Sequence, residues 1–142
     1  SSAASDVYKR QIDTISSFHL PQDEESKRLP FEKAAFGAIG LQTLLPACLK
    51  LVHDKILDLP TLFKKISLNP AKLLNLKTGI LKEDYPADLI LFDPDKPFTV
   101  DRFELLSKAK NTPFDGYKLY GEVLKTFVKG NEIYKSRNTI DT

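Results

Sequence analysis

A polar stretch that runs into a glycine-containing turn holds the residues best suited to chemistry. It extends from Ser16 to Gly40 and reads SSFHLPQDEESKRLPFEKAAFGAIG. The imidazole of His19 can bind a metal ion or transfer a proton, whereas a single histidine with no second ligand nearby is often a structural group. Gly37 and Gly40, at the mouth of a helix, let backbone N–H groups approach an anion or serve packing alone. The spacing leaves both alternatives open for each feature.

Three adjacent carboxylates follow the histidine. Asp23, Glu24 and Glu25 have the chemistry of general acids, general bases or metal ligands. Lys27 and Arg28 come directly after them, and this arrangement is typical of a solvent-exposed loop with local ion pairs. The sequence therefore favours a structural role for these charges over a catalytic one.

Two further polar features are predicted to be structural. His53 ends an apolar run and is expected to cap helix carbonyls or to face solvent. The stretch SKAKNTPFDG, from Ser107 to Gly116, is too irregular for a helix or a strand and is expected to form an ordered loop locked by Asn111 and Pro113. Its spacing alone indicates no chemistry.

The composition limits the classes of function. The chain has 142 residues, of which 42% are hydrophobic and 28% charged, so it can fill one domain core or part of a larger one. Its net charge of +2 and its scattered basic residues argue against a nucleic-acid partner. The lone cysteine, Cys48, lies in the apolar stretch LQTLLPACLKLV, which predicts a buried thiol and excludes an intrachain disulfide. Because no apolar run reaches the length of a membrane span, about 18 residues, a cytoplasmic protein without a membrane partner is expected.

The elements that must hold these residues follow from the apolar pattern. Residues 1–11 show no periodicity and are predicted to be a non-native or disordered leader. Residues 12–18 carry β-branched side chains and suit a short buried strand that ends near Phe18. Residues 36–52 suit a helix, in which Pro46 is tolerated near the first turn or at a kink.

Two shorter helices and three strands complete the pattern. Asp58 is expected to cap one short helix, and Asn69 to begin another. This second helix is expected to point three leucines inward, namely Leu73, Leu74 and Leu76. After a break at Gly79, ADLILFDP is predicted to be a strand that Asp93-Pro94 stops, and EVLKTFVKGNEIYK to be a hairpin. The chain is thus predicted to be helical before Gly79 and β-rich after it.

Three segments together resemble the dihydroorotase branch of the cyclic amidohydrolases, class I. They are HLPQDEESKRLPFEKAAFGAIGLQTLLP, PADLILFDPDKPFTVD, and SKAKNTPFDG with the following GEVLKTFVKGNEIY. The motif Asn-Thr-Pro-Phe, residues 111–114, favours dihydroorotase over allantoinase or hydantoinase. The resemblance implies an α/β fold and a C-terminal fragment. Residues 12–78 would be the last strand, active-site loop and helices of a metal-dependent-hydrolase TIM barrel, 79–136 part of a small β-sandwich, and 137–142 a tail.

The resemblance also implies roles for individual residues. Gln22, Phe36 and Gly37 match positions that hold the substrate in the family, and His19 matches the histidine beside a metal-binding aspartate. That aspartate, which also transfers the proton, falls on Phe18, whose ring can neither bind zinc nor accept a proton. No catalytic residue and no metal ligand is therefore expected within this chain.

The reaction that the resemblance implies is the reversible cyclisation of N-carbamoyl-L-aspartate to L-dihydroorotate, a zinc-dependent step of pyrimidine biosynthesis. The zinc ligands would lie upstream, so this chain alone is expected neither to bind zinc tightly nor to turn over this small-molecule substrate. The phenylalanine at the aspartate position supports a second hypothesis, a non-catalytic homologue that is a structural partner of aspartate transcarbamoylase. A homodimer is also compatible with the resemblance.

Overall fold

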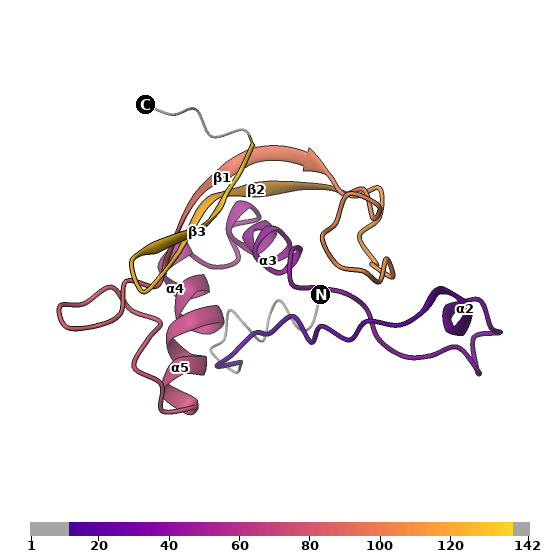
Figure 1. Ribbon diagram of the computed structural model, residues 1–142, viewed down its shortest axis with the longest axis horizontal. Coiled ribbons are helices and arrows are strands. Elements are labelled where there is room, and N and C mark those ends of the chain that lie inside the picture. The colour runs from indigo at the N-terminus through magenta and orange to yellow at the C-terminus, as the bar shows by residue number, and fades with distance from the viewer. Residues whose placement is uncertain (1–11, 138–142) are drawn as a thin grey trace.

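A three-stranded antiparallel sheet arches over one central helix in the computed structural model, which describes residues 12–137 (Figure 1). The predicted leader 1–11 and all but the first residue of the predicted tail 137–142 lie outside the described residues. The strands are β1 (Leu89–Thr99), β2 (Lys118–Val128) and β3 (Asn131–Lys135), in the order β1-β2-β3. The helices are α2 (Glu24–Lys27), α3 (Leu44–His53), α4 (Leu59–Phe63), the π-helix η1 (Lys64–Leu68) and α5 (Asn69–Leu73).

The hairpin prediction is confirmed. The pair Val128 and Asn131 closes a two-residue turn in which Lys129 and Gly130 both have positive φ, 50° and 80°. Positive φ at both central residues is the geometry that matches the right-handed twist of two paired strands. Strand β1 runs further than predicted and ends at Thr99. Its pairing with β2 is interrupted after Asp93 but resumes at Pro97.

The helix predicted over residues 36–52 begins later than expected, at Leu44. The residues before it are committed to other hydrogen bonds, since Ala38 forms a parallel bridge with His19 and the N–H of Ile39 donates to the carbonyl of Asn111 at 3.1 Å. Pro46 lies in the first turn of α3, where its missing N–H costs no helical bond. The apolar face of α3 is buried as predicted, and burial raises the pKa of the Cys48 thiol.

The second helical region is continuous, and its middle turn changes which side chains face inward. Asp58 caps α4 as predicted, with its carboxylate accepting from the N–H of Thr61 at 2.8 Å. The π-helix η1 then gives the helix a wider turn, and one extra residue rotates every later side chain by about 100°. The prediction that three leucines of this region point inward is wrong, and two of them lie beyond the end of α5 at Leu73. They are 77%, 67% and 54% exposed, in the order Leu73, Leu74 and Leu76.

The prediction of a buried strand over residues 12–18 is also wrong in detail. The segment is extended, but within the described residues no neighbouring strand runs alongside it, and Phe18 is 83% exposed. It is attached to the π-helix instead. The N–H of Ile15 donates to the carbonyl of Lys65 at 2.9 Å, and the buried Nζ of Lys65 donates to the carbonyl of Ile12.

The core lies where α3 meets β2. Leu49 and Leu62 are fully buried and cluster with Cys48, and Phe92 of β1 packs against them. The approach is close because Gly121 of β2 has no side chain: a Cβ there would lie 2.3 Å from Cδ1 of Leu49. Gly121 also has φ of +110°, a conformation that a residue with a Cβ adopts only under strain.

Replacing this glycine tests whether the contact is essential. We expect Gly121→Ala to lower the free energy of unfolding by about 1–3 kcal/mol more than a backbone effect alone, because the new methyl overpacks the core. Gly116→Ala is the matched control, since Gly116 has φ of +75° but nothing within 4 Å of the added Cβ. Urea unfolding of both variants measures the difference. If both variants lost the same free energy of unfolding, the contact between α3 and Gly121 would not be essential.

Candidate functional site

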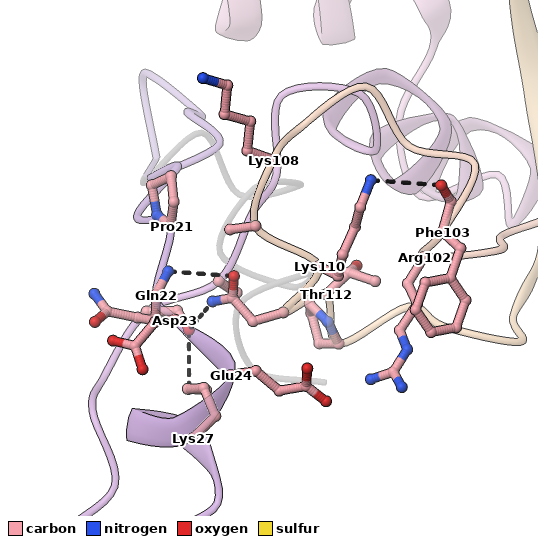
Figure 2. Close-up of a pocket in the computed structure, with 15 residues that line it drawn as sticks. Pro21, Gln22, Asp23, Glu24, Lys27, Arg102, Phe103, Lys108, Lys110 and Thr112 are labelled. Atoms are coloured by element: carbon pink, nitrogen blue, oxygen red, sulfur yellow. Dashed lines mark hydrogen bonds between the residues drawn. The ribbon is translucent and has the colours of Figure 1, made fainter.

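A groove of about 860 Å³ opens where three loops meet, and it is the best candidate for a functional site (Figure 2). One wall is the loop around Gln22 together with α2, and the second is the turn at Gly37. The third wall is the long connection between β1 and β2, from Arg102 to Pro113. Residues distant in the sequence thus border one cavity.

Asn111 joins the three walls. Its side-chain Oδ1 accepts a hydrogen bond from the N–H of Gln22 at 3.3 Å, and its Nδ2 donates to the carbonyl of Gly37 at 3.1 Å. The predicted locking role of Asn111 is therefore confirmed. Sequence reasoning found no chemistry in its loop, yet this loop forms a whole side of the groove.

The turn at Gly37 has a backbone that only glycine adopts easily. Its φ is +130°, and a Cβ would lie 2.6 Å from the carbonyl oxygen of Leu20. Lys27 crosses from α2 to this turn, where its Nζ donates to the carbonyls of Ala35 at 2.8 Å and of Gly37 at 3.0 Å. The sequence suggested an ion-pairing role for Lys27 and gave no sign of this contact.

The predicted structural role of the acidic run is confirmed. Asp23 caps α2 by accepting from the N–H of Ser26 at 2.7 Å, and this bond together with the Ser26 side chain holds the pKa of the Asp23 carboxyl below its ordinary value. Glu24 pairs with Arg28 at 2.8 Å on the exposed surface. The side chains of Asp23 and Glu24 are thus engaged locally, which suits a groove wall better than a general base.

Two of the three cations on the third wall, Lys110 and Arg102, are also held by the protein itself. Figure 2 shows Lys110 directed at the carbonyl of Phe103, 3.4 Å away, and its shorter bond, 2.6 Å, goes to the carbonyl of Leu105. Arg102 lies 3.6 Å from Asp115. These contacts order the loop and leave its positive charge beside the groove.

His19 lies apart from this groove. Its Nδ1 accepts from the N–H of Gly40 at 3.0 Å and, less directly, from that of Leu41 at 3.4 Å, which assigns the ring proton to Nε2. The ring borders a small separate pocket next to Leu105 and Leu106. The structural alternative for His19 thus has direct geometric support, because the imidazole fixes the chain as it enters α3.

The remaining predicted site residues divide between two cavities. Gln22 and Gly37 border the groove, whereas Phe36 borders a second, apolar pocket that Gly37 and Phe18 also line. The rings of Phe36 and Phe18 are 84% and 83% exposed. The structure therefore brings together two of the three residues that were expected to contact substrate and places the third next to them.

The residues present do not form a zinc site by themselves. Protein zinc sites use three or four nitrogen, sulfur or oxygen ligands, and among residues 12–137 no three His, Cys, Asp or Glu side chains come together in that way. Phe18 offers no ligand atom, and one nitrogen of His19 is already bonded to the backbone. The second histidine, His53, contacts Asp95 at 3.2 Å and the ring of Tyr120.

Within residues 12–137, none of the helices has the length and apolar character that a membrane span requires.

Comparisons with known proteins identify the relatives of the chain. Residues 35–133 match the Amidohydrolase family. The dihydroorotase of Ehrlichia chaffeensis is 42% identical over 125 residues, which cover 88% of this chain and 28% of that protein. The dihydroorotase of Desulforapulum autotrophicum is 44% identical over 124 residues, which cover 87% and 29%. The chain thus spans less than a third of the length of these relatives.

The solved structures agree on the fold. The L-hydantoinase (dihydropyrimidinase) of Arthrobacter aurescens superposes with a TM-score of 0.90 at 30% identity, over 98% of this chain and 32% of that one. The dihydropyrimidinase of Brevibacillus agri superposes with a TM-score of 0.88 at 21% identity, over 94% and 31%. The mixed helical and β architecture is therefore that of a fragment of the fold that these enzymes share.

The role of His19 can be tested by replacing its acceptor atom. We expect His19→Phe to lower the free energy of unfolding by about 1–3 kcal/mol, because the N–H groups of Gly40 and Leu41 lose their partner. His19→Asn, which places an amide oxygen near the position of Nδ1, should lose less. Urea unfolding, with hydrogen exchange at the Gly40 amide, measures both effects. If the two variants lose the same stability, the acceptor is unimportant.

Proposed function

Because the chain belongs to the amidohydrolase family, we propose that it is the C-terminal part of a cytoplasmic dihydroorotase. Such an enzyme interconverts N-carbamoyl-L-aspartate and L-dihydroorotate in pyrimidine biosynthesis. The observation that carries this proposal is the similarity to dihydroorotases at 42% and 44% identity, over nearly nine tenths of the chain. The groove supports it, because two of the residues that the resemblance assigns to substrate border that groove.

The chain would contribute the wall of the site that holds the substrate's carboxylate. The side-chain amide of Gln22 can donate to a carboxylate oxygen, and the turn at Gly37 brings backbone close to the groove without a side chain in the way. The cations of the third wall, Arg102, Lys108 and Lys110, favour an acidic substrate. Zinc, when bound in the parent enzyme by residues outside this chain, would polarise the amide carbonyl that reacts.

A second candidate function rests on Phe18. This residue takes the place of the aspartate that ligates metal and transfers the proton in the family, and its exposed ring lines the second, apolar pocket. A parent protein that lost this carboxylate would be a structural homologue whose role lies in assembly with aspartate transcarbamoylase. The two candidates differ in whether the parent turns over substrate.

Assay of the full-length parent with carbamoyl-aspartate and dihydroorotate, with zinc quantified in the same sample, distinguishes them. Turnover with bound zinc supports the enzyme. Absence of turnover and of bound zinc supports the non-catalytic homologue and contradicts the first proposal.

We expect Phe18→Asp to raise the kcat/KM of the parent by at least about 100-fold, the scale of a general acid–base contribution, and Phe18→Asn not to do so.

The isolated 142-residue chain provides a further test. We expect it neither to retain zinc after dialysis nor to turn over dihydroorotate, since Phe18 removes a ligand and the described residues form no cluster of three. Stoichiometric zinc with cyclase activity in the purified chain would overturn this expectation. Atomic absorption and a spectrophotometric assay give the two readings.

A further inference from the structure

We propose that Asn111 is a positioning residue for substrate binding in the parent enzyme, and that it acts through the backbone of Gln22 and Gly37. The inference rests on the proposed function, because it names how the carboxylate-binding wall of that site is held in shape. Asn111 itself need not contact the substrate. Its role follows from the use of both ends of its side-chain amide within the protein.

The amide of Asn111 makes two contacts at once, one through each of its two polar atoms. An amide has a donor and an acceptor on one rigid plane, and here the acceptor takes the N–H of Gln22 while the donor reaches the carbonyl of Gly37. The main chain adds a third contact, because the Asn111 carbonyl accepts from the N–H of Ile39 at 3.1 Å. The segments of Gln22 and Gly37 lie next to each other, since the N–H of Leu20 donates to the carbonyl of Ala38 at 2.9 Å. Asn111 thus ties the β1–β2 connection to both of these neighbouring segments.

The carbonyl of Gly37 is held from a second direction. Lys27 donates to the same oxygen at 3.0 Å, so one acceptor receives a neutral and a charged donor. Because a fixed carbonyl fixes the whole peptide plane, the N–H of the next residue, Ala38, is held in one orientation.

Glycine reaches a φ of +130° easily but reaches other conformations as easily, so contacts with the surroundings must select this one at Gly37. Asn111 and Lys27 supply those contacts, and a preformed turn lowers the entropic cost of binding a carboxylate. Loss of Asn111 should therefore weaken ground-state binding and leave the chemical step nearly unchanged, which appears in KM rather than in kcat.

The test uses the full-length parent with dihydroorotate as the substrate. We expect Asn111→Ala to raise KM about tenfold, the value of one or two hydrogen bonds, with kcat changed by less than about threefold. Asn131→Ala, an exposed asparagine of β3 far from the groove, is the matched control and should leave both constants unchanged. If Asn111→Ala does not fold, Asn111→Asp replaces it, since it keeps the acceptor and loses the donor. An unchanged KM, or a loss confined to kcat, overturns the proposal.

A double-mutant cycle separates positioning from general stability. Because Asn111 and Lys27 hold the same carbonyl, the effects of Asn111→Ala and Lys27→Met on KM should not be additive. Lys33→Met, at an exposed lysine, is the control for the second position and should be additive with Asn111→Ala. Additive behaviour in the first pair would contradict a shared action on Gly37.

A parent without turnover would contradict the proposed function but still allow a decision on Asn111. Hydrogen exchange then reports the positioning directly. We expect the Gln22 amide to exchange about tenfold faster in Asn111→Ala than in the unmodified parent, because its acceptor is gone. Unchanged exchange at Gln22 would overturn the positioning role regardless of activity.

Discussion

The close contact between Leu49 of α3 and Gly121 of β2 sets the distance between the helical part of the chain and its sheet. A side chain at that glycine would push the helix outward, and the loops at the ends of α3 and of the strands would move with it. The groove lies between those loops. The segment before α3 forms one side and the β1–β2 connection forms the other. The packing of the core and the contacts of Asn111 therefore bear on the same loops.

The groove differs from most small-molecule sites in how its polar groups are used. Lys27, Lys110 and Asn111 donate to backbone carbonyls, and the carboxylate of Asp23 accepts from a backbone N–H. These side chains hold loops in shape, so backbone groups and Gln22 are left to meet a ligand. A ligand that binds such a surface would be recognised mainly by its charge and by the outline of the turn.

The sequence predicted the elements whose signals are local. The cap at Asp58, the turn at Lys129 and Gly130 and the buried face around Leu49 each depend on a few neighbouring residues. It failed where a distant partner decides, because the bonds of Ile39 to Asn111 and of Gly40 to His19 keep the chain before α3 out of the helix. The site was predicted only as far as the family resemblance reached. The contacts of Asn111 with Gln22 and Gly37, and of Lys27 with Gly37, were not predicted because they join separate loops.

The span of the Asn111 contact has a consequence for the order in which the molecule assembles. The bond to Gln22 links residues 89 positions apart, whereas the hairpin turn and the helix caps close within a few residues. Closing so long a loop costs more entropy than any of those local steps, and it requires the sheet to have docked on α3 first. We therefore expect the groove to form last during folding, and to be the first part of the chain to open as the native state fluctuates.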